Sequence, residues 1–375
     1  MGHPLLQTTK TRIEPFLRDR RLTLLGILGV LTLLLACYPA NEVTYSSPQD
    51  TGAAQWLIEF RTGEDKVHME LRYQRKREKG GHGYSSNGFM IAPEKLSGLT
   101  RAQAMSSGTN VKFQLQRDAG TFYFEGWFKE GNGSGHFTFS PNTSFGAELN
   151  RLGIGTPDAE QQLSMALHDV GFALINELKS QSYEQPTLEQ LVKMGQHGVH
   201  LEYVQGLKSL GYSVKYIDFL IKMRDHGVTV NFIRELTSLN YTGLTAEELI
   251  RTRDHGVTGK FIEEFRAAGY NQQTLEDWIK LRDHGVNMNY VRELDSLGYS
   301  KLPIDELRRM RDHGVNASFI QELKDAGYHK IPVEQLIRLR DHGVNAKFIQ
   351  KMKDIGHKDL TLDEYIRLRD RGERY

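Results

Sequence analysis

The 375-residue sequence predicts an α+β protein of several domains: an amino-terminal membrane or signal helix, a small antiparallel β-domain and a carboxy-terminal α-solenoid of helix-pair repeats. Three observations predict this. Glycine recurs every 29 residues through the second half, apolar and polar residues alternate before it, and an uncharged apolar run lies near the amino end. The expected boundaries are a short basic segment at 1–21, the membrane or signal segment at 22–38, a polar linker at 39–54, the β-domain at 55–140 and the solenoid at 142–372.

The amino-terminal segment is an apolar run with basic residues only before it. Arg18, Arg20 and Arg21 precede a stretch without charge that ends at Ala36, and Cys37 follows. Positive charge stays on the cytoplasmic side of a membrane, so we expect the body of the protein to be extracytoplasmic, in the periplasm or at the cell surface. The protein is then anchored to the cell membrane.

Two forms of this anchor stay open. Residues 34–37 resemble the lipobox of bacterial lipoproteins, which would make Cys37 a lipidation site after cleavage. Alternatively the segment is retained as a signal anchor, although residues 22–37 are fewer than the roughly 20 that usually span a bilayer. Cys37 is the only cysteine of the sequence, so no internal disulfide can form.

Period-two alternation predicts short strands after the linker, at 56–60, 67–73, 111–115, 122–128 and 136–139. A glycine-rich turn at 131–135 predicts a hairpin between the last two, and 93–105 favours a short helix. The sequence does not choose between a sandwich, a roll and a β-solenoid. Tyr123 and Trp127 fall on the face opposite Phe122, Phe124 and Phe128. We expect both faces to be covered, one of them by the first helical repeat; the alternative is an exposed aromatic patch.

The 29-residue repeat predicts pairs of short helices, each ended by a glycine after its last apolar position. Helix starts carry reciprocal capping pairs such as Thr245 with Glu248. The period extends to eight helix pairs between 142 and 372, which must stack to bury their apolar faces. Equivalent positions then form two core rows. These are Tyr203, Phe232, Phe261, Tyr290, Phe319 and Phe348, and Leu207, Leu236, Phe265, Leu294, Leu323 and Met352.

The motif Arg-Asp-His-Gly repeats at the end of the second helix of most pairs. We interpret its histidines and glycines as a structural ladder at the helix carboxyl ends, where Asp and His bond free carbonyls or bridge to the next repeat. The ladder consists of His197, His226, His255, His284, His313 and His342, with Gly198, Gly227, Gly256, Gly285, Gly314 and Gly343. The alternative is a column that binds metal or relays protons. Stacked helices lie about 8 to 10 Å apart, too far for their histidines to converge on one ion, so we expect no metal and no cofactor.

The charge balance and the absence of known catalytic motifs exclude several classes of function. The 48 basic and 47 acidic residues nearly cancel, which argues against nucleic-acid binding. The sequence contains no zinc-protease, nucleophile-elbow or phosphate-loop motif, and we expect no enzyme. The remaining catalytic alternative is an unfamiliar site in the β-domain around His68, Glu70, His82 and His136.

Three segments and the repeats together carry a resemblance to a known family. Residues 113–122, 133–139 and 166–170, with the 29-residue repeats, resemble the extracytoplasmic region of bacterial β-lactam-sensor-type membrane metalloproteases and related anti-sigma-type membrane proteins. The resemblance covers about 55–372 and does not include the protease domain, and residues 1–21 are too few for an anti-sigma domain. It implies a sensing or scaffolding ectodomain without its effector.

These observations predict a membrane-tethered binding or scaffold protein that recognises a protein or peptide partner. One slot changes chemistry from repeat to repeat: Glu202, Asn231, Lys260, Asn289, Ser318 and Lys347. Another stays basic and could face an acidic partner or simply solvent: Lys222, Arg251, Lys280, Arg309 and Arg338. The alternative function is a sensor subunit that signals through its single membrane helix to a separate effector.

Overall fold

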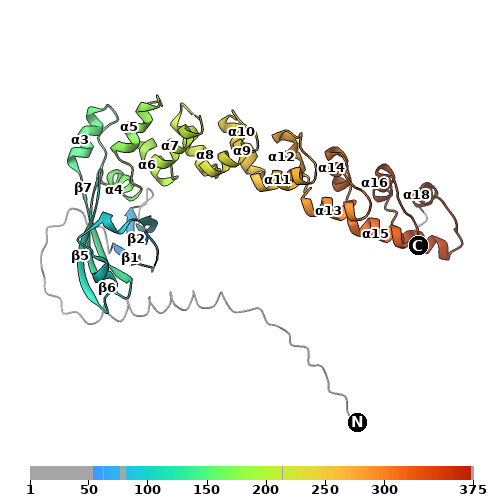
Figure 1. Cartoon of the computed structure of the whole chain (residues 1–375), viewed down its shortest axis with the longest axis horizontal. Helices are drawn as coiled ribbons and strands as arrows, with labels where there is room; N and C mark the ends of the chain where they lie inside the picture. Colours follow the sequence, from blue (N-terminus) through green and yellow to red (C-terminus); the bar gives the residue numbers. More distant parts are fainter. Residues whose placement is uncertain (1–53, 62, 77–81, 213, 373–375) are drawn as a thin grey trace, which may run out of the picture. The chain divides into compact units, whose positions relative to one another are not determined.

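The computed structural model describes residues 54–372, apart from Thr62, residues 77–81 and Ser213. These residues belong to one compact unit, in which a β-sheet is followed by paired helices (Figure 1). The predicted membrane segment at 22–38 and Cys37 lie outside the described residues. Within them, no helix is long and apolar enough to cross a membrane.

The described part of the β-region is one antiparallel sheet of seven strands in the order β3-β2-β1-β7-β6-β5-β4. The first strand lies between the second and the last, so the two ends of this region meet in the middle of the sheet. The strands are β1 Gln55–Glu59, β2 Val67–Lys76, β3 His82–Ile91, β4 Leu96–Ser97, β5 Thr109–Arg117, β6 Gly120–Lys129 and β7 Asn132–Pro141. A 3-10 turn η1 (Pro93–Lys95) and a short helix α2 (Arg101–Ala104) flank β4.

The sequence did not predict strands β3 and β4. The turn between β6 and β7 lies earlier in the chain than the predicted 131–135. β3 lies in a segment for which the sequence predicted no strand, and β4 interrupts the helix expected at 93–105. The turn after β6 is short, because β7 already begins at Asn132 and so includes Gly133 and Gly135. These two glycines are strand residues: Gly133 pairs with Phe128, and Gly135 pairs with Gly126.

One face of the sheet is a dense aromatic core and the other is open. Trp56, Phe122 and Phe128 are fully buried, and the indole N–H of Trp56 donates to the carbonyl oxygen of Glu125 at 3.2 Å. Tyr123 on the other face is 46% exposed, and Trp127 is half-buried. The expectation that both faces are covered is therefore wrong for the Tyr123 side.

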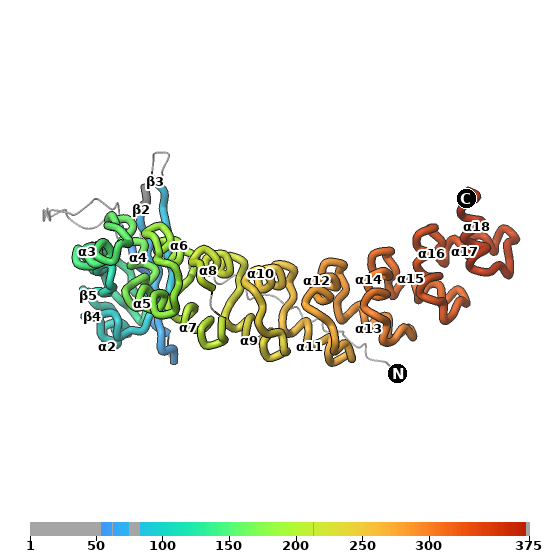
Figure 2. Tube along the Cα trace, turned by 90° about the horizontal axis from the view of Figure 1, so that it is seen from above, coloured from blue at the N-terminus to red at the C-terminus, as the bar shows by residue number. Residues whose placement is uncertain are grey.

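Within the described residues, sixteen nine-residue helices follow the sheet in two rows, as the repeat predicts (Figures 1 and 2). Odd-numbered helices pack on odd-numbered neighbours and even-numbered on even-numbered ones. The helices are α3 Thr143–Arg151, α4 Ala159–Leu167, α5 Phe172–Ser180, α6 Leu188–Gln196, α7 Leu201–Ser209, α8 Ile217–Asp225, α9 Val230–Ser238, α10 Ala246–Asp254, α11 Gly259–Ala267, α12 Leu275–Asp283, α13 Met288–Ser296, α14 Ile304–Asp312, α15 Ala317–Asp325, α16 Val333–Asp341, α17 Ala346–Asp354 and α18 Leu362–Asp370.

The caps and core rows explain why each repeat folds this way. Thr245 and Glu248 exchange side-chain and backbone hydrogen bonds, which satisfies the first free amides of α10. Gly256 ends the same helix at φ +69°, a left-handed conformation that costs glycine little. Every residue of the expected aromatic row is at most 9% exposed, and every residue of the second row is fully buried. The helical repeat is thus confirmed.

Candidate functional site

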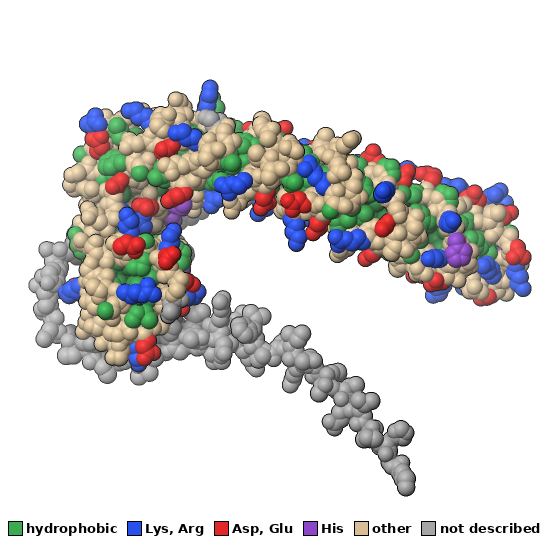
Figure 3. All heavy atoms as spheres, viewed as in Figure 1, with side chains coloured by type: hydrophobic (Ala, Val, Ile, Leu, Met, Phe, Trp, Pro, Cys, Tyr) green, Lys and Arg blue, Asp and Glu red, His purple; other side chains and the backbone are tan. Residues whose placement is uncertain are grey.

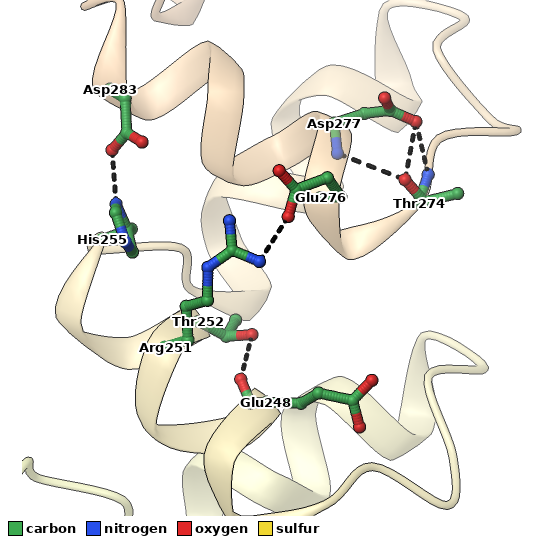
Figure 4. A network of polar contacts seen from close by, with 8 residues as sticks. All are labelled: Glu248, Arg251, Thr252, His255, Thr274, Glu276, Asp277 and Asp283. Atoms are coloured by element: carbon green, nitrogen blue, oxygen red, sulfur yellow. Dashed lines mark hydrogen bonds and ion pairs between the residues drawn. The ribbon is translucent and has the colours of Figure 1, made fainter.

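The Arg-Asp-His-Gly motif forms the joint between consecutive repeats. In the copy at the end of α10, the guanidinium of Arg253 lies 5.4 Å from the ring centre of Phe232 in α9. Asp254 is 2.8 Å from Nδ1 of His226 in the preceding repeat. Nδ1 of His255 is 2.5 Å from Asp283 in the following repeat (Figure 4). A single motif therefore ties three repeats together.

The same contacts recur along the array. Six successive His–Asp bridges join even-numbered helices: His197 with Asp225, His226 with Asp254, His255 with Asp283, His284 with Asp312, His313 with Asp341 and His342 with Asp370. In the described residues no group of three or more His, Cys, Asp or Glu side chains is placed to hold a metal ion.

The basic row, for which the sequence left open an acidic partner or solvent, is partly engaged in ion pairs within the chain. Arg251 pairs with Glu276 at 2.6 Å (Figure 4), Arg309 with Glu334 at 2.6 Å and Arg338 with Asp363 at 3.0 Å. Each of these ion pairs crosses from one repeat to the next. By contrast, the slot with changing chemistry lies on the exposed side of the odd-numbered helices.

The ladder breaks at its first repeats, and the sheet supplies the missing partners. Gly195 and Gln196 stand where other copies have Arg and Asp. Arg117, at the end of β5, instead makes an ion pair with Asp169, which occupies the slot of the helix-ending glycine at φ +55°. A Cβ at position 195 would lie 2.7 Å from the Cβ of His168, so glycine is required there.

The histidine and the helix start at this joint also receive partners from the sheet. Asn87 of β3 places its amide nitrogen 3.1 Å from Nε2 of His168, replacing the absent aspartate. The backbone N–H of Phe172 donates to Asp118 at 2.7 Å, and Asn142 donates to the carbonyl of Asp118 at 2.9 Å. The sheet thus caps α5 and completes the first rung of the ladder.

A cleft of about 840 Å³ lies at this joint, between β3 on one side and α4 to α7 on the other. Charged side chains and a histidine gather where the sheet meets the helices (Figure 3). Much of its lining is polar and uncharged, including Asn87, Gln116, Asn142 and Gln196. It is the candidate functional site, because a concave surface with convergent polar groups is the usual form of a binding site.

Burial sets the charge state of the cleft. It lowers the pKa of His168 to about 4, with a smaller contribution from His200. Burial also lowers the pKa of His200, against the attraction of Glu202, and lowers the pKa of Arg117 to about 10. At neutral pH both histidines are uncharged, while Arg117 keeps its charge and its ion pair with Asp169.

Acid should therefore weaken this joint. The folded-state pKa of His168 is about 4 and its unfolded value is 6.5, so the unfolded chain binds the extra proton between these pH values and stability falls as pH falls through that window. After discounting for the partial exposure of the ring, we expect a loss of about 1 to 2 kcal/mol. Urea unfolding at about pH 7 and about pH 4.5 checks this. The difference should shrink in His168→Gln; an equal difference in both proteins would contradict it.

The four residues of the catalytic alternative lie at separate places in the sheet. His68 and Glu70 lie on β2, whereas His136 lies on β7, with β1 between them. His68 is opposite Glu59 at one end of β1, and His136 is opposite Gln55 at the other. His82 pairs with Lys76 at the far end of β2. Two cleft residues were named from the sequence, Gly198 in the ladder and Glu202 in the variable slot, but not as parts of one site. The sequence signal for the cleft was Gly195-Gln196, which departs from the motif.

Comparison of the chain with protein-family models and with curated proteins finds no match.

Proposed function

We propose that the protein is a membrane-tethered, extracytoplasmic binding or scaffold protein that holds a protein or peptide partner without altering it chemically. One observation carries the proposal. Side chains that repeat without change are used to join the repeats, whereas the exposed slot on the odd-numbered helices differs at each step. A stacked array that varies its exposed positions is suited to recognising an extended surface.

The non-catalytic part of the proposal is supported by the use of the histidines. Each ladder histidine from His197 to His342 is held through Nδ1 by an aspartate of the next repeat. His168 is held by Asn87 and stays neutral at physiological pH. These contacts account for the repeated His and Asp residues as structural groups.

The tether and the location are proposed from the sequence. Arg18, Arg20 and Arg21 before the apolar run favour a cytoplasmic amino end. The body would then face the periplasm or the cell surface of a bacterium, anchored either by the retained segment or by a lipid on Cys37. Mass analysis of the mature amino terminus separates these two forms.

Site-specific photo-crosslinking tests the binding role. We expect a photoreactive residue at Lys260 or Lys347, in the variable slot of α11 and α17, to capture the same partner in intact cells. A photoreactive residue at Glu247, exposed on the even-numbered helix α10, is the matched control and should capture less. If the folded protein gave no adduct from either slot position, the array would not be a binding platform.

A further inference from the structure

We propose that the edge of β3 that pairs with no strand of the described residues is a strand-addition site, at which an extended peptide segment of a partner protein pairs with β3 inside the cleft. This rests on the proposed function and deepens it, because it names a docking site and the chemistry of the partner. Main-chain hydrogen bonds to an open strand edge supply affinity in such sites, and side-chain pockets supply selectivity.

The two edges of the sheet differ in how they are protected. β4 has two residues, follows Pro93 and Lys95, and pairs only with Gln114 and Leu115 of β5. The rest of this edge, along β5, carries the charged residues Lys112 and Arg117. β3 is ten residues long and contains no charged residue and no proline. Edge strands are normally blunted by shortness, charge or proline. β3 has none of these three features, so its backbone is suited to pairing with an added strand.

The cleft follows this edge. Five consecutive residues of β3, from Ser86 to Met90, line it. Consecutive side chains of a strand point to opposite faces, so a cleft that touches all five runs along the strand's edge and not over one face. An added strand would lie about 4.8 Å from β3, between it and the helices. The first turn of α7, at Leu201 and Glu202, forms part of the opposite wall.

The helices on the other side of the cleft favour a single extended peptide over a second copy of the chain as the occupant. A second copy of the chain would have to bring its whole sheet and its first helices up to the edge of β3, where α4 to α7 already stand. A single extended peptide needs only the space of one strand. A cleft of about 840 Å³ is in the range of sites that enclose a ligand of this size. The occupant is therefore a peptide segment and not a second sheet.

The lining indicates the chemistry of that segment. Lys95 and Arg117 face Asp118, Asp169 and Glu202 around the cleft, so its charges nearly balance. The helical wall offers glycines and amides, which favour small, uncharged polar side chains on the peptide. Tyr84 and Met90 on the outer face of β3 are 82% and 52% exposed and would contact the alternate side chains. We infer a segment that alternates small polar with apolar residues.

Peptide selection on the full chain tests the proposal. The probe is a displayed library of random peptides, followed by a synthetic, fluorescently labelled copy of the enriched sequence. We expect enrichment of the alternating pattern, and slower hydrogen exchange of backbone amides in 84–90 on binding. Gln196→Trp should weaken binding about tenfold or more, because the indole fills the cleft from α6. Lys193→Trp, exposed on the same helix outside the cleft, should leave binding unchanged.

A second measurement does not depend on any protein variant. Methylating the backbone nitrogens along one side of the peptide removes the hydrogen bonds to β3 and should abolish binding. Failure to enrich any peptide, or binding that neither protects 84–90 nor responds to Gln196→Trp, would overturn the strand-addition site. If crosslinking through Lys260 and Lys347 still succeeded, the binding platform would stand. If crosslinking failed while a peptide protected β3, the proposed binding role of the helical array would be wrong, and the strand-addition site would still be supported.

Discussion

Replacing Gly135 by valine should unfold the β-sheet. A Cβ at this position would press against the carbonyl oxygen of Glu125 and lie 2.6 Å from the Cα of Gly126 on the paired strand. A Cβ at Gly126 would in turn meet the ring of Trp56 at 2.7 Å. The backbone of β6 cannot move away without displacing the aromatic core, so we expect a loss of about 4 kcal/mol or more.

Urea unfolding followed by tryptophan fluorescence measures this loss. Thr138→Val is the matched control, since Thr138 is exposed on the same strand and pairs with Tyr123 on the open face. It should change the free energy of unfolding by less than about 0.5 kcal/mol. A Gly135→Val protein as stable as Thr138→Val would show that β6 and β7 do not pair in this register.

The helical half could be predicted closely because its signals are local and repeated. The Thr245–Glu248 capping pair, the glycine at 256 and the rows that contain Phe261 and Phe265 are all visible within one 29-residue window. Tertiary contacts between repeats then reuse the same positions. The roles of Arg253 and its equivalents, which stack on the aromatic row, were not predicted, because a repeated arginine also fits a solvated surface.

The β-region could be predicted only in part, for physical reasons. β3 has two glycines and three serine or asparagine residues, and its pairing with β2 outweighs its weak intrinsic preference. The cleft depends on Asn87 and Arg117 meeting His168 and Asp169, which are 50 or more residues away in the chain. No local pattern reports such contacts. The departure from the motif at Gly195-Gln196 indicated that this joint differs from the others, but not that residues of the sheet replace the missing Arg and Asp.

Removing one complete repeat should leave a folded protein. Deleting residues 287–315 takes out α13 and α14 and joins Val286 to Asn316, two positions that are neighbours in every repeat. His284 then meets Asp341 in place of Asp312, so the bridge is rebuilt. Stability in a stacked array comes from contacts between neighbours, and the new neighbours are equivalent to the old ones.

Removing one helix of a pair should have the opposite effect. Deleting residues 287–299 takes out α13 alone and brings α14 directly after α12, two helices of the same row. The odd-numbered row is left with a gap between α11 and α15, and the aromatic row loses Tyr290. We expect the array beyond α12 to unfold or aggregate.

Urea unfolding of these two deletion proteins, followed by far-ultraviolet circular dichroism, tests the stacked-repeat account most directly. We expect the protein lacking 287–315 to keep helical signal in proportion to its length and to unfold cooperatively, and the protein lacking 287–299 to lose the helical signal of the repeats beyond α12. Loss of folding in both, as expected for a single indivisible core, would contradict it.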